Sequence, residues 1–259
     1  MQITVKQTTG KIKKPAISLT NLSKRFGSFT AVDNLNLEIG WGEIFGLLGP
    51  NGAGKTTTIN MLSTLLDPSS GTAAVAGYDV VKHANEVRTL IGVCPQQPAF
   101  FPYLTGRENI QLFGHLHLIP QDLLAERTNQ LVKQMGLEDD VDRRAGHYSG
   151  GLVRRISTIM ALIHDPDIAL LDEPTVAMDP VSRRSVWDFI KELRQKEKTI
   201  ILTTHYMEEA QELADRVGII DQGRLIELGT PEALIEKYNV DDLEGVFVNI
   251  TGKKLKEAV

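Results

Sequence analysis

The stretch "GPNGAGKTT" at residues 49–57 has the residue types and the spacing of a loop that binds phosphate. Its glycines allow backbone N–H groups to curl around phosphate oxygens, and the helix predicted from "TTTINMLSTLL" would point its positive end at the same anion. Lys55 would reach the β- and γ-phosphates of a nucleotide, while the Thr56 hydroxyl would bind Mg²⁺. A chance glycine-rich turn is the alternative, but it explains neither the buried strand before the loop nor the helix after it. The predicted ATP-binding residues of this loop are Gly49, Pro50, Asn51, Gly52, Ala53, Gly54, Lys55, Thr56 and Thr57.

Two adjacent carboxylates follow a predicted buried strand in "IALLDEPT". They would lie at the carboxyl edge of the sheet, where open α/β folds bind their ligands. Asp172 would hold Mg²⁺ through water, and Glu173 would polarise the attacking water as a general base. A solvated loop after a strand is the alternative, and the phosphate loop in the same chain argues against it. Together the two motifs predict a P-loop NTPase.

The stretch "YSGGLVRRI" predicts a helix whose first turn has very little side chain. Apolar residues recur at helical spacing from Leu152 onward, and Ser149 can cap the helix. Gly150 and Gly151 would then leave the first N–H groups uncovered, which makes this helix end a second anion site. One nucleotide does not need two such sites in one chain. We therefore predict that Ser149, Gly150 and Gly151 bind the γ-phosphate held by another copy of the chain.

Together these motifs resemble the ATP-binding subunits of ABC transporters, over roughly residues 16–235 and in the family's order. The resemblance identifies "GPNGAGKT" as the Walker A loop, "IALLDE" as the Walker B strand and "YSGGL" as the signature. In the family, two nucleotide domains close head to tail and hold two ATP, each between one Walker A loop and the other domain's signature. The resemblance therefore implies ATP and Mg²⁺ as ligands and a second ATPase subunit, expected as a homodimer.

The resemblance also assigns roles to residues outside these motifs. Gln96 in "CPQQ" would ligate Mg²⁺ and move with the helical lobe, and His205 in "TTHYMEEA" would contact the γ-phosphate or its attacking water. Asp179 belongs to the D-loop, "VAMD". Phe26 in "LSKRFG" would stack on adenine, with Phe29 as the competing residue. The implied catalytic residues are Glu173, His205 and Gln96, and the implied metal ligands are Thr56, Gln96 and Asp172.

Two positions depart from the commonest family pattern. Tyr148 and Leu152 flank the Ser-Gly-Gly of a signature that is most often LSGGQ, so phosphate contact should come mainly from Ser149 and the glycine backbone. We expect Leu152 to weaken a nearby polar contact without preventing closure. Ala177 stands where the D-loop often has Ser, which should change the hydrogen bonds across the interface.

Composition narrows the possible functions further. The chain has 259 residues and a formal charge of -5, which argues against a nucleic-acid binder because that binding rests on clustered Lys and Arg. Arg143–Arg144, Arg154–Arg155 and Arg183–Arg184 are interpreted as solvated helix faces or local ion pairs. Cys94 has no partner for a disulfide, which favours a reducing compartment. No metal-ligand arrangement is predicted for His83, His115, His117, His147 and His164.

The elements that must position these motifs form an α/β pattern. Alternation in "AISLTNL" and "LNLEI" predicts half-exposed antiparallel strands. The apolar runs "EIFGLLG", "IGVCP", "DIALLD", "TIILTTH" and "VGIID" are typical of strands buried on both faces of a parallel sheet. We predict a mostly parallel core sheet, an N-terminal antiparallel β subdomain and an inserted α-helical subdomain over about residues 100–165. The predicted divisions are a polar arm at 1–15, the ATPase domain at 16–235 and a C-terminal appendage at 236–259.

The sequence thus predicts a cytoplasmic ATPase subunit, held on the inner face of the cell membrane by a separate integral-membrane permease. Its longest apolar runs are far short of the roughly 20 residues that span a bilayer. The sequences "YSGGLVRR", "EPTVAMDP" and "LEGVFVNITGKKL" resemble those of the daunorubicin-resistance branch, whose members mostly export drugs, lipids or polymers. The alternatives are an importer ATPase, a soluble ABC ATPase of translation or DNA repair, and a nucleotide-binding regulator without turnover. Glu173 and His205 argue against the regulator.

Overall fold

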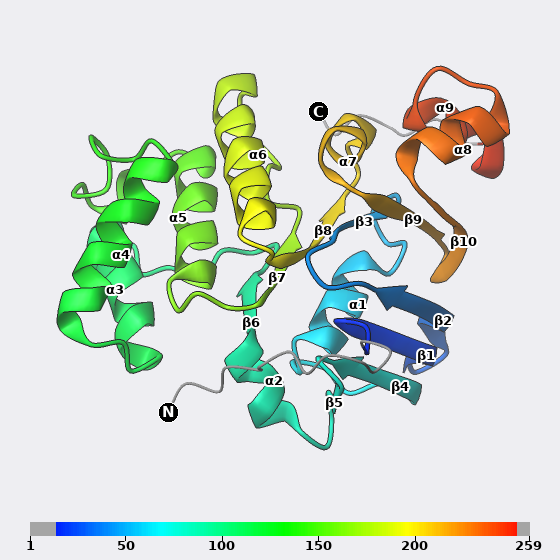
Figure 1. Cartoon of the computed structure of the whole chain (residues 1–259), viewed down its shortest axis with the longest axis horizontal. Helices are drawn as coiled ribbons and strands as arrows, with labels where there is room; N and C mark the ends of the chain where they lie inside the picture. Colours follow the sequence, from blue (N-terminus) through cyan, green and yellow to red (C-terminus); the bar gives the residue numbers. More distant parts are fainter. Residues whose placement is uncertain (1–13, 253–259) are drawn as a thin grey trace.

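The computed structural model describes residues 14–252, an α/β arrangement of two sheets and a lobe of helices (Figure 1). Most of the predicted polar arm at 1–15 lies outside the described residues, and so do residues 253–259. The fold class predicted from the sequence is confirmed, with its antiparallel sheet, mostly parallel sheet and inserted helices.

The first sheet is antiparallel and has the strand order β2-β1-β4-β5. Its strands are β1 (Ile17–Phe26), β2 (Phe29–Ile39), β4 (Ser70–Val75) and β5 (Tyr78–Asp79). Along β2, Leu35 and Leu37 are buried while Asn36 is exposed, as the alternation predicts. The pairing of β1 with β2 ends with Phe26 opposite Phe29, so both candidate stacking residues lie at one end of this hairpin.

The second sheet has the strand order β10-β9-β3-β8-β7-β6. Its strands are β3 (Ile44–Leu48), β6 (Ile91–Cys94), β7 (Ile168–Asp172), β8 (Thr199–Thr204), β9 (Arg216–Asp221) and β10 (Arg224–Gly229). All neighbours pair in parallel except β9 and β10, and every residue of β3, β7 and β8 is buried. Leu48 pairs with Thr204 and Asp172 with Thr203, so the carboxyl ends of β3, β8 and β7 meet at one edge.

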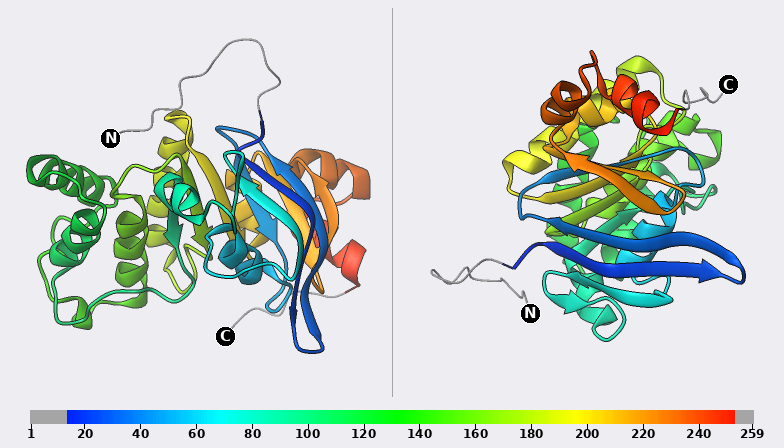
Figure 2. Two further views of the ribbon diagram at one scale, coloured as in Figure 1. Left: turned by 90° about the horizontal axis from the view of Figure 1, so that it is seen from below. Right: turned by 90° about the vertical axis from the view of Figure 1, so that its right-hand side faces the viewer.

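Helices flank the parallel sheet and form a separate lobe (Figures 1 and 2). The flanking helices are α1 (Lys55–Leu62), α2 (Ala84–Leu90), α6 (Pro180–Gln195) and α7 (Met207–Leu213). The lobe lies between β6 and β7 in sequence and contains α3 (Gly106–Leu116), α4 (Gln121–Gln134), a 3₁₀ turn (Ala145–His147) and α5 (Gly150–Leu162). One buried cluster joins Leu124 and Ile159 of the lobe to Cys94 and Leu171 of the sheet, so the lobe is anchored on the core.

The last described helices are α8 (Pro231–Tyr238) and α9 (Leu243–Thr251); α9 packs on α7, and α8 packs against α9 and β10. The predicted helix at "TPEALIEKY" is present, and Thr230 caps it by accepting a hydrogen bond from the Ala233 N–H. α8 runs through residue 235, where the sequence placed a division. Val246 and Phe247 of α9 share a buried cluster with Leu48 of β3, so this part of the C-terminal segment packs into the core of the parallel sheet.

The arginine pairs behave differently from one another. Arg143 makes a local ion pair with Asp140, as predicted. The reading of Arg154–Arg155 as a solvated face is wrong: Arg154 is 4% exposed and donates from Nη1 to the Pro95 carbonyl at 2.7 Å, and Arg155 donates to the Met135 carbonyl at 3.0 Å. Neighbouring loops cover this face of α5, and their carbonyl oxygens have no hydrogen-bond partner within a helix or sheet. The guanidinium groups of Arg154 and Arg155 donate to these carbonyls.

His117 and His164 stack on each other, with 3.8 Å between ring centroids and 2° between ring planes. His164 is also bonded through Nε2 to the carbonyl oxygen of Ile91 at 3.0 Å, so the pair links the lobe to β6. Burial, followed by the neighbouring His117 ring, lowers the pKa of His164 to about 4. His164 is therefore uncharged at neutral pH.

This depressed pKa predicts a loss of stability in mild acid. Above pH 6.5 His164 is neutral in both the folded and the unfolded chain, whereas between pH 6.5 and about 4 only the unfolded chain binds the proton. The free energy of unfolding should fall by about 2 kcal/mol across that window, after allowance for partial solvent exposure. Urea titrations at several pH values would measure it. His164→Gln should flatten the dependence, and an unchanged slope in that variant would contradict the assignment.

Candidate functional site

The phosphate-binding loop connects β3 to α1, as predicted. Gly54, at φ 107°, directly precedes Lys55, the first residue of α1. A Cβ on Gly49 would lie 2.2 Å from the carbonyl oxygen of Ile220, and one on Gly54 would lie 2.5 Å from that of Ala31. Any side chain at these two positions would collide with backbone, so the path of the loop requires glycine.

Lys55 lies buried behind this loop. Its Nζ donates to the carbonyl oxygens of Gly49 at 2.7 Å and Pro50 at 3.2 Å, and it lies 3.5 Å from Oε1 of Glu173. Burial lowers the pKa of Lys55, while the charge of Glu173 opposes that shift. The ammonium group therefore stands at the loop with a carboxylate as its partner.

The Glu173 carboxylate brings together the other predicted catalytic residues. Oε1 lies 3.2 Å from Nδ1 of His205, and Oε2 accepts a hydrogen bond from Nε2 of Gln96 at 3.2 Å. Burial raises the pKa of Glu173, but the hydrogen bond with His205, the charge of Lys55 and the Gln96 contact together lower it to about 2. Glu173 is thus held as a carboxylate, the form that a general base needs.

The backbone of Glu173 is unusual for a residue with a side chain. Its φ is 52°, and its N–H donates to the carbonyl oxygen and the hydroxyl of Thr203 on β8 at 3.1 Å each. A non-glycine residue in this region costs on the order of 1 kcal/mol, and such residues cluster at functional sites. The bonds to β8 hold the turn that aims the carboxylate toward Lys55.

The proposed metal ligands fit a hard cation. Asp172 is buried and accepts a hydrogen bond from the Thr203 hydroxyl, and Thr56 is half-buried at the start of α1. Within residues 14–252, no group of three or more His, Cys, Asp or Glu residues could hold a metal. A metal here would depend on hydroxyl, amide, carboxylate and phosphate oxygens, a donor set typical of Mg²⁺ and unlike that of zinc.

The helix predicted at "YSGGL" is α5, and it begins as predicted. The Ser149 hydroxyl accepts a hydrogen bond from the Leu152 N–H at 3.3 Å. Ser149 and Gly150 are exposed, and a Cβ on Gly150 would have no heavy atom within 4 Å. Tyr148 anchors the preceding turn by donating to the Asp140 carbonyl at 2.8 Å. Ser149 and Gly150 at the start of α5 therefore face open space, whereas Gly151 is buried and a Cβ on it would lie 3.6 Å from Met178 Cγ.

The D-loop runs from Val176 to the start of α6. Asp179 caps α6 by accepting hydrogen bonds from the N–H groups of Val181 and Ser182 at 3.0 Å. Hydrogen bonding from the Ser182 side chain, followed by the Ser182 N–H, lowers the pKa of Asp179. Ala177 has φ 60°, a conformation that Ala rarely adopts. Local capping therefore accounts for Asp179 within one chain, and its contact with a second chain stays a prediction.

The sequence interpretation missed a buried carboxylic acid next to this site. Glu209 of α7 is 0% exposed, and its Oε1 accepts hydrogen bonds from Thr175 and Trp187. The only local signal was its place four residues after His205. Charged residues are rarely buried, so a sequence pattern assigns such a Glu to the exposed face.

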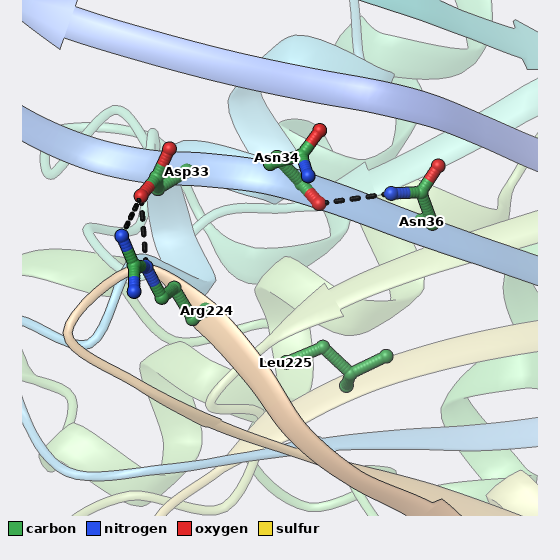
Figure 3. Close-up of a pocket in the computed structure, with 5 residues that line it drawn as sticks. All are labelled: Asp33, Asn34, Asn36, Arg224 and Leu225. Carbon is green, nitrogen blue, oxygen red and sulfur yellow. Dashed lines mark hydrogen bonds and ion pairs between the residues drawn. The ribbon is translucent and has the colours of Figure 1, made fainter.

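Among residues 14–252, two of the cavities lie away from the phosphate loop. One, of about 550 Å³, lies between β2 and β10, where Arg224 forms an ion pair with Asp33 (Figure 3). It contains none of the predicted site residues. The other is a groove of about 340 Å³ between α1, β6 and the helical lobe, and the apolar residues that line it include Leu65, Val93 and Phe113.

Comparison with known proteins decides the family. The sequence model described as ABC transporter matches residues 32–176 of the chain. The chain belongs to the ABC transporter family. It is 41% identical to the daunorubicin resistance ATP-binding protein DrrA3 of Streptomyces coeruleorubidus, over 90% of this chain and 73% of that protein. It is 42% identical to the Nod factor export ATP-binding protein I of Cupriavidus metallidurans, over 89% of this chain and 76% of that protein.

Solved structures agree with this membership. A structure described as the ATP binding subunit of an ABC transporter covers 91% of this chain and 99% of its own, with a TM-score of 0.83 and 24% identity. The ATP-binding cassette MJ0796, solved as a post-hydrolysis dimer bound to ADP and Pi, covers 83% of this chain and 98% of its own, with a TM-score of 0.75 and 26% identity. This ABC protein is an ATPase, as the sequence predicted.

The adenine site of this ABC ATPase has two candidate aromatic residues. Phe26 is 50% exposed and Phe29 is 60% exposed, and they flank the turn of the β1–β2 hairpin. The Nζ of Lys24 lies 5.3 Å from the Phe26 ring centroid. Exposure of both rings leaves the choice between them open, and the assignment to Phe26 stays a prediction.

Replacing each ring in turn would test that assignment. Stacking of one base on an aromatic ring contributes about 1–3 kcal/mol, so Phe26→Ala should weaken ATP binding about tenfold. Phe29→Ala is the matched control and should change the affinity less than about twofold. Titration calorimetry with ATP would measure both. The reverse order of effects would assign adenine stacking to Phe29.

Proposed function

We propose that this chain is the ATP-hydrolysing subunit of an exporter, and that two copies close head to tail around two ATP to power a separate integral-membrane permease. The cargo class is drugs, lipids or other hydrophobic compounds. The observation that carries the proposal is the convergence of Lys55, His205 and Gln96 on the Glu173 carboxylate. A phosphate-binding cation, a general base and a polar residue beside the attacking water are what phosphoanhydride hydrolysis needs.

ATP would redistribute the charges at this site. Lys55, which contacts loop carbonyls and Glu173, would turn its charge toward the β- and γ-phosphates. Oε1 of Glu173 would then be free to accept a proton from the attacking water, while His205 contacts that water or the γ-phosphate. Mg²⁺ held by Thr56, Asp172 and Gln96 would neutralise charge on the phosphates.

The open start of α5 would complete the site in a second copy. Ser149 and the backbone of Gly150 and Gly151 would offer N–H and hydroxyl groups at a positive helix end whose first two residues, Ser149 and Gly150, are exposed. A γ-phosphate bound there would join two chains, so ATP would favour the closed dimer and hydrolysis would remove the bridge. The dimeric ATP-binding cassette bound to ADP and Pi supports this arrangement.

The permease would dock at the groove beside the helical lobe. Among the described residues, no helix is both long and apolar enough to cross a bilayer. The groove contains Pro95, which directly precedes Gln96, and exposes the apolar side chain of Leu65. A permease segment seated there would sense movement of Gln96 with the lobe. The chain would then lie on the cytoplasmic face of the membrane, held there through the permease.

Export is favoured by the relatives, which are named for daunorubicin resistance and for Nod factor export. An importer ATPase is the alternative within transport, because the hydrolysis site is the same for both directions. A soluble ABC ATPase of translation or DNA repair is the alternative outside transport. The net charge of -5 disfavours it, since nucleic-acid binding rests on clustered positive charge.

Removal of the general base tests hydrolysis and dimerisation together. Glu173→Gln should bind ATP, accumulate as a closed dimer and hydrolyse ATP at least about 100-fold more slowly, because general-base catalysis contributes at least that factor. Phosphate release and light scattering with and without ATP would measure these effects. Glu232→Gln, an exposed position on α8, is the control and should behave as wild type. Wild-type turnover in Glu173→Gln would remove Glu173 from the mechanism.

Isolation of the native complex tests the partner. The chain should co-purify from detergent-solubilised membranes with one integral protein, and that protein should raise its ATPase rate. Leu65→Glu in the groove should weaken the complex about tenfold or more, because a buried unpaired carboxylate costs several kcal/mol. Leu228→Glu on β10 is the control outside the groove and should not weaken it. Purification without any membrane protein, in an active form, would favour the soluble alternative.

A further inference from the structure

A buried carboxylic acid connects three segments that carry predicted site residues. Glu209 lies on α7, directly after the loop that contains His205, and its side chain is wholly buried. Its Oε1 accepts a hydrogen bond from the Thr175 hydroxyl at 2.7 Å and another from Nε1 of Trp187 at 3.0 Å. One carboxyl oxygen therefore joins α7 to the segment after Glu173 and to α6.

The two partners of Glu209 lie next to other residues of the predicted site. Thr175 is two residues after Glu173, and it is itself buried. Trp187 lies on α6, the helix that Asp179 caps at the end of the D-loop. Because α7 begins two residues after His205, a fixed α7 also fixes the start of the His205 loop. The Nδ1 of His205 in turn lies 3.2 Å from Oε1 of Glu173.

Stability alone does not explain a carboxylic acid at this position. Burial raises the pKa of Glu209, and the hydrogen bonds from Thr175, Thr204 and Trp187 only partly oppose the shift. A buried polar group costs free energy unless its partners are well placed, and an apolar side chain of similar size often stabilises a core at least as well. What an apolar side chain cannot do is accept two directed hydrogen bonds from different segments.

We propose that Glu209 is a positioning residue that sets the distance between His205 and Glu173 by holding α7 on Thr175 and Trp187. It touches neither substrate nor the reacting atoms. The inference rests on the proposed catalytic roles of Glu173 and His205. It predicts that Glu209 controls the turnover of bound ATP, whereas the affinity for ATP depends on the Walker A loop and the β1–β2 hairpin.

Five variants test this role by steady-state ATPase kinetics. Glu209→Leu keeps the volume and loses the acceptor, so it should lower kcat about tenfold and change KM less than about threefold. Glu209→Gln keeps a carbonyl acceptor and should recover at least half of the wild-type kcat. Thr175→Val should lower kcat about threefold to fivefold, and Thr175→Ser, which keeps the hydroxyl, should restore it. The double variant Glu209→Leu/Thr175→Val should be no slower than Glu209→Leu alone, because each substitution removes the same hydrogen bond between Thr175 and Glu209.

Several results would overturn the proposal. One is a kcat of Glu209→Leu within twofold of wild type, and another is a fall in kcat for Glu209→Gln as large as that for Glu209→Leu. A third is a double variant whose kcat falls by the product of the factors seen for Glu209→Leu and Thr175→Val separately, which would mean that the two residues act independently. Thermal denaturation would show whether each variant folds. If Glu209→Leu does not fold, Thr175→Val decides, and a kcat within 1.5-fold of wild type would overturn the proposal.

Reference variants separate this inference from the proposed function. Glu173→Gln and His205→Ala are measured in parallel. If both are inactive while Glu209→Leu turns over normally, only the positioning role fails. If both keep wild-type turnover, the proposed roles of Glu173 and His205 fail, and the positioning role fails with them.

Discussion

The buried carboxylate of Glu173 is the charge on which the arrangement of the site depends. A carboxylate without partners in such a place costs several kcal/mol, and Lys55, His205 and Gln96 offset that cost. These three residues follow β3, β8 and β6, while Glu173 follows β7. They meet because those strands run parallel in one sheet and end at one edge. The strand order of the parallel sheet is therefore what assembles the site.

Lys55 and the start of α5 both present positive charge or partial positive charge that a negatively charged phosphate could satisfy. Lys55 donates to loop carbonyls and faces Glu173, so its positive charge is already placed where phosphate would bind. At the start of α5, Ser149 and Gly150 are exposed, and a Cβ on Gly150 would have no heavy atom within 4 Å. A triphosphate has enough negative charge and enough acceptors to satisfy both groups. In the proposed dimer, one nucleotide would therefore contact both copies of the chain.

Buried polar side chains connect the elements around the site. Arg154 of α5 bonds the carbonyl of Pro95, next to Gln96, and Glu209 of α7 bonds Thr175, next to the Walker B carboxylates. The first bond joins α5 to the loop after β6, and the second joins α7 to the loop after β7. Apolar packing is tolerant of small shifts, whereas a directed hydrogen bond in a low dielectric environment holds one geometry.

The sequence determined the local features of this protein. Glycines that permit one loop path, Ser and Thr at helix starts, and apolar runs of a fixed period depend on neighbours in the chain. These patterns predicted the phosphate loop, the Ser149 cap and the buried strands. They also placed Glu173 and His205 at strand ends, and the resemblance to a known family assigned both to hydrolysis. The hydrogen bond between the two side chains was not predicted.

Only the tertiary structure decided which polar residues are buried and what they contact. Arg154 and Glu209 look like surface residues in sequence, because a charged residue on an amphipathic helix is usually exposed. Their burial depends on segments far away in the chain, Pro95 for one and Thr175 with Trp187 for the other. The packing of α9 against β3 in one buried cluster could not be predicted from the sequence either. Local patterns carry no information about such partners, since packing between distant segments exists only once the chain has folded.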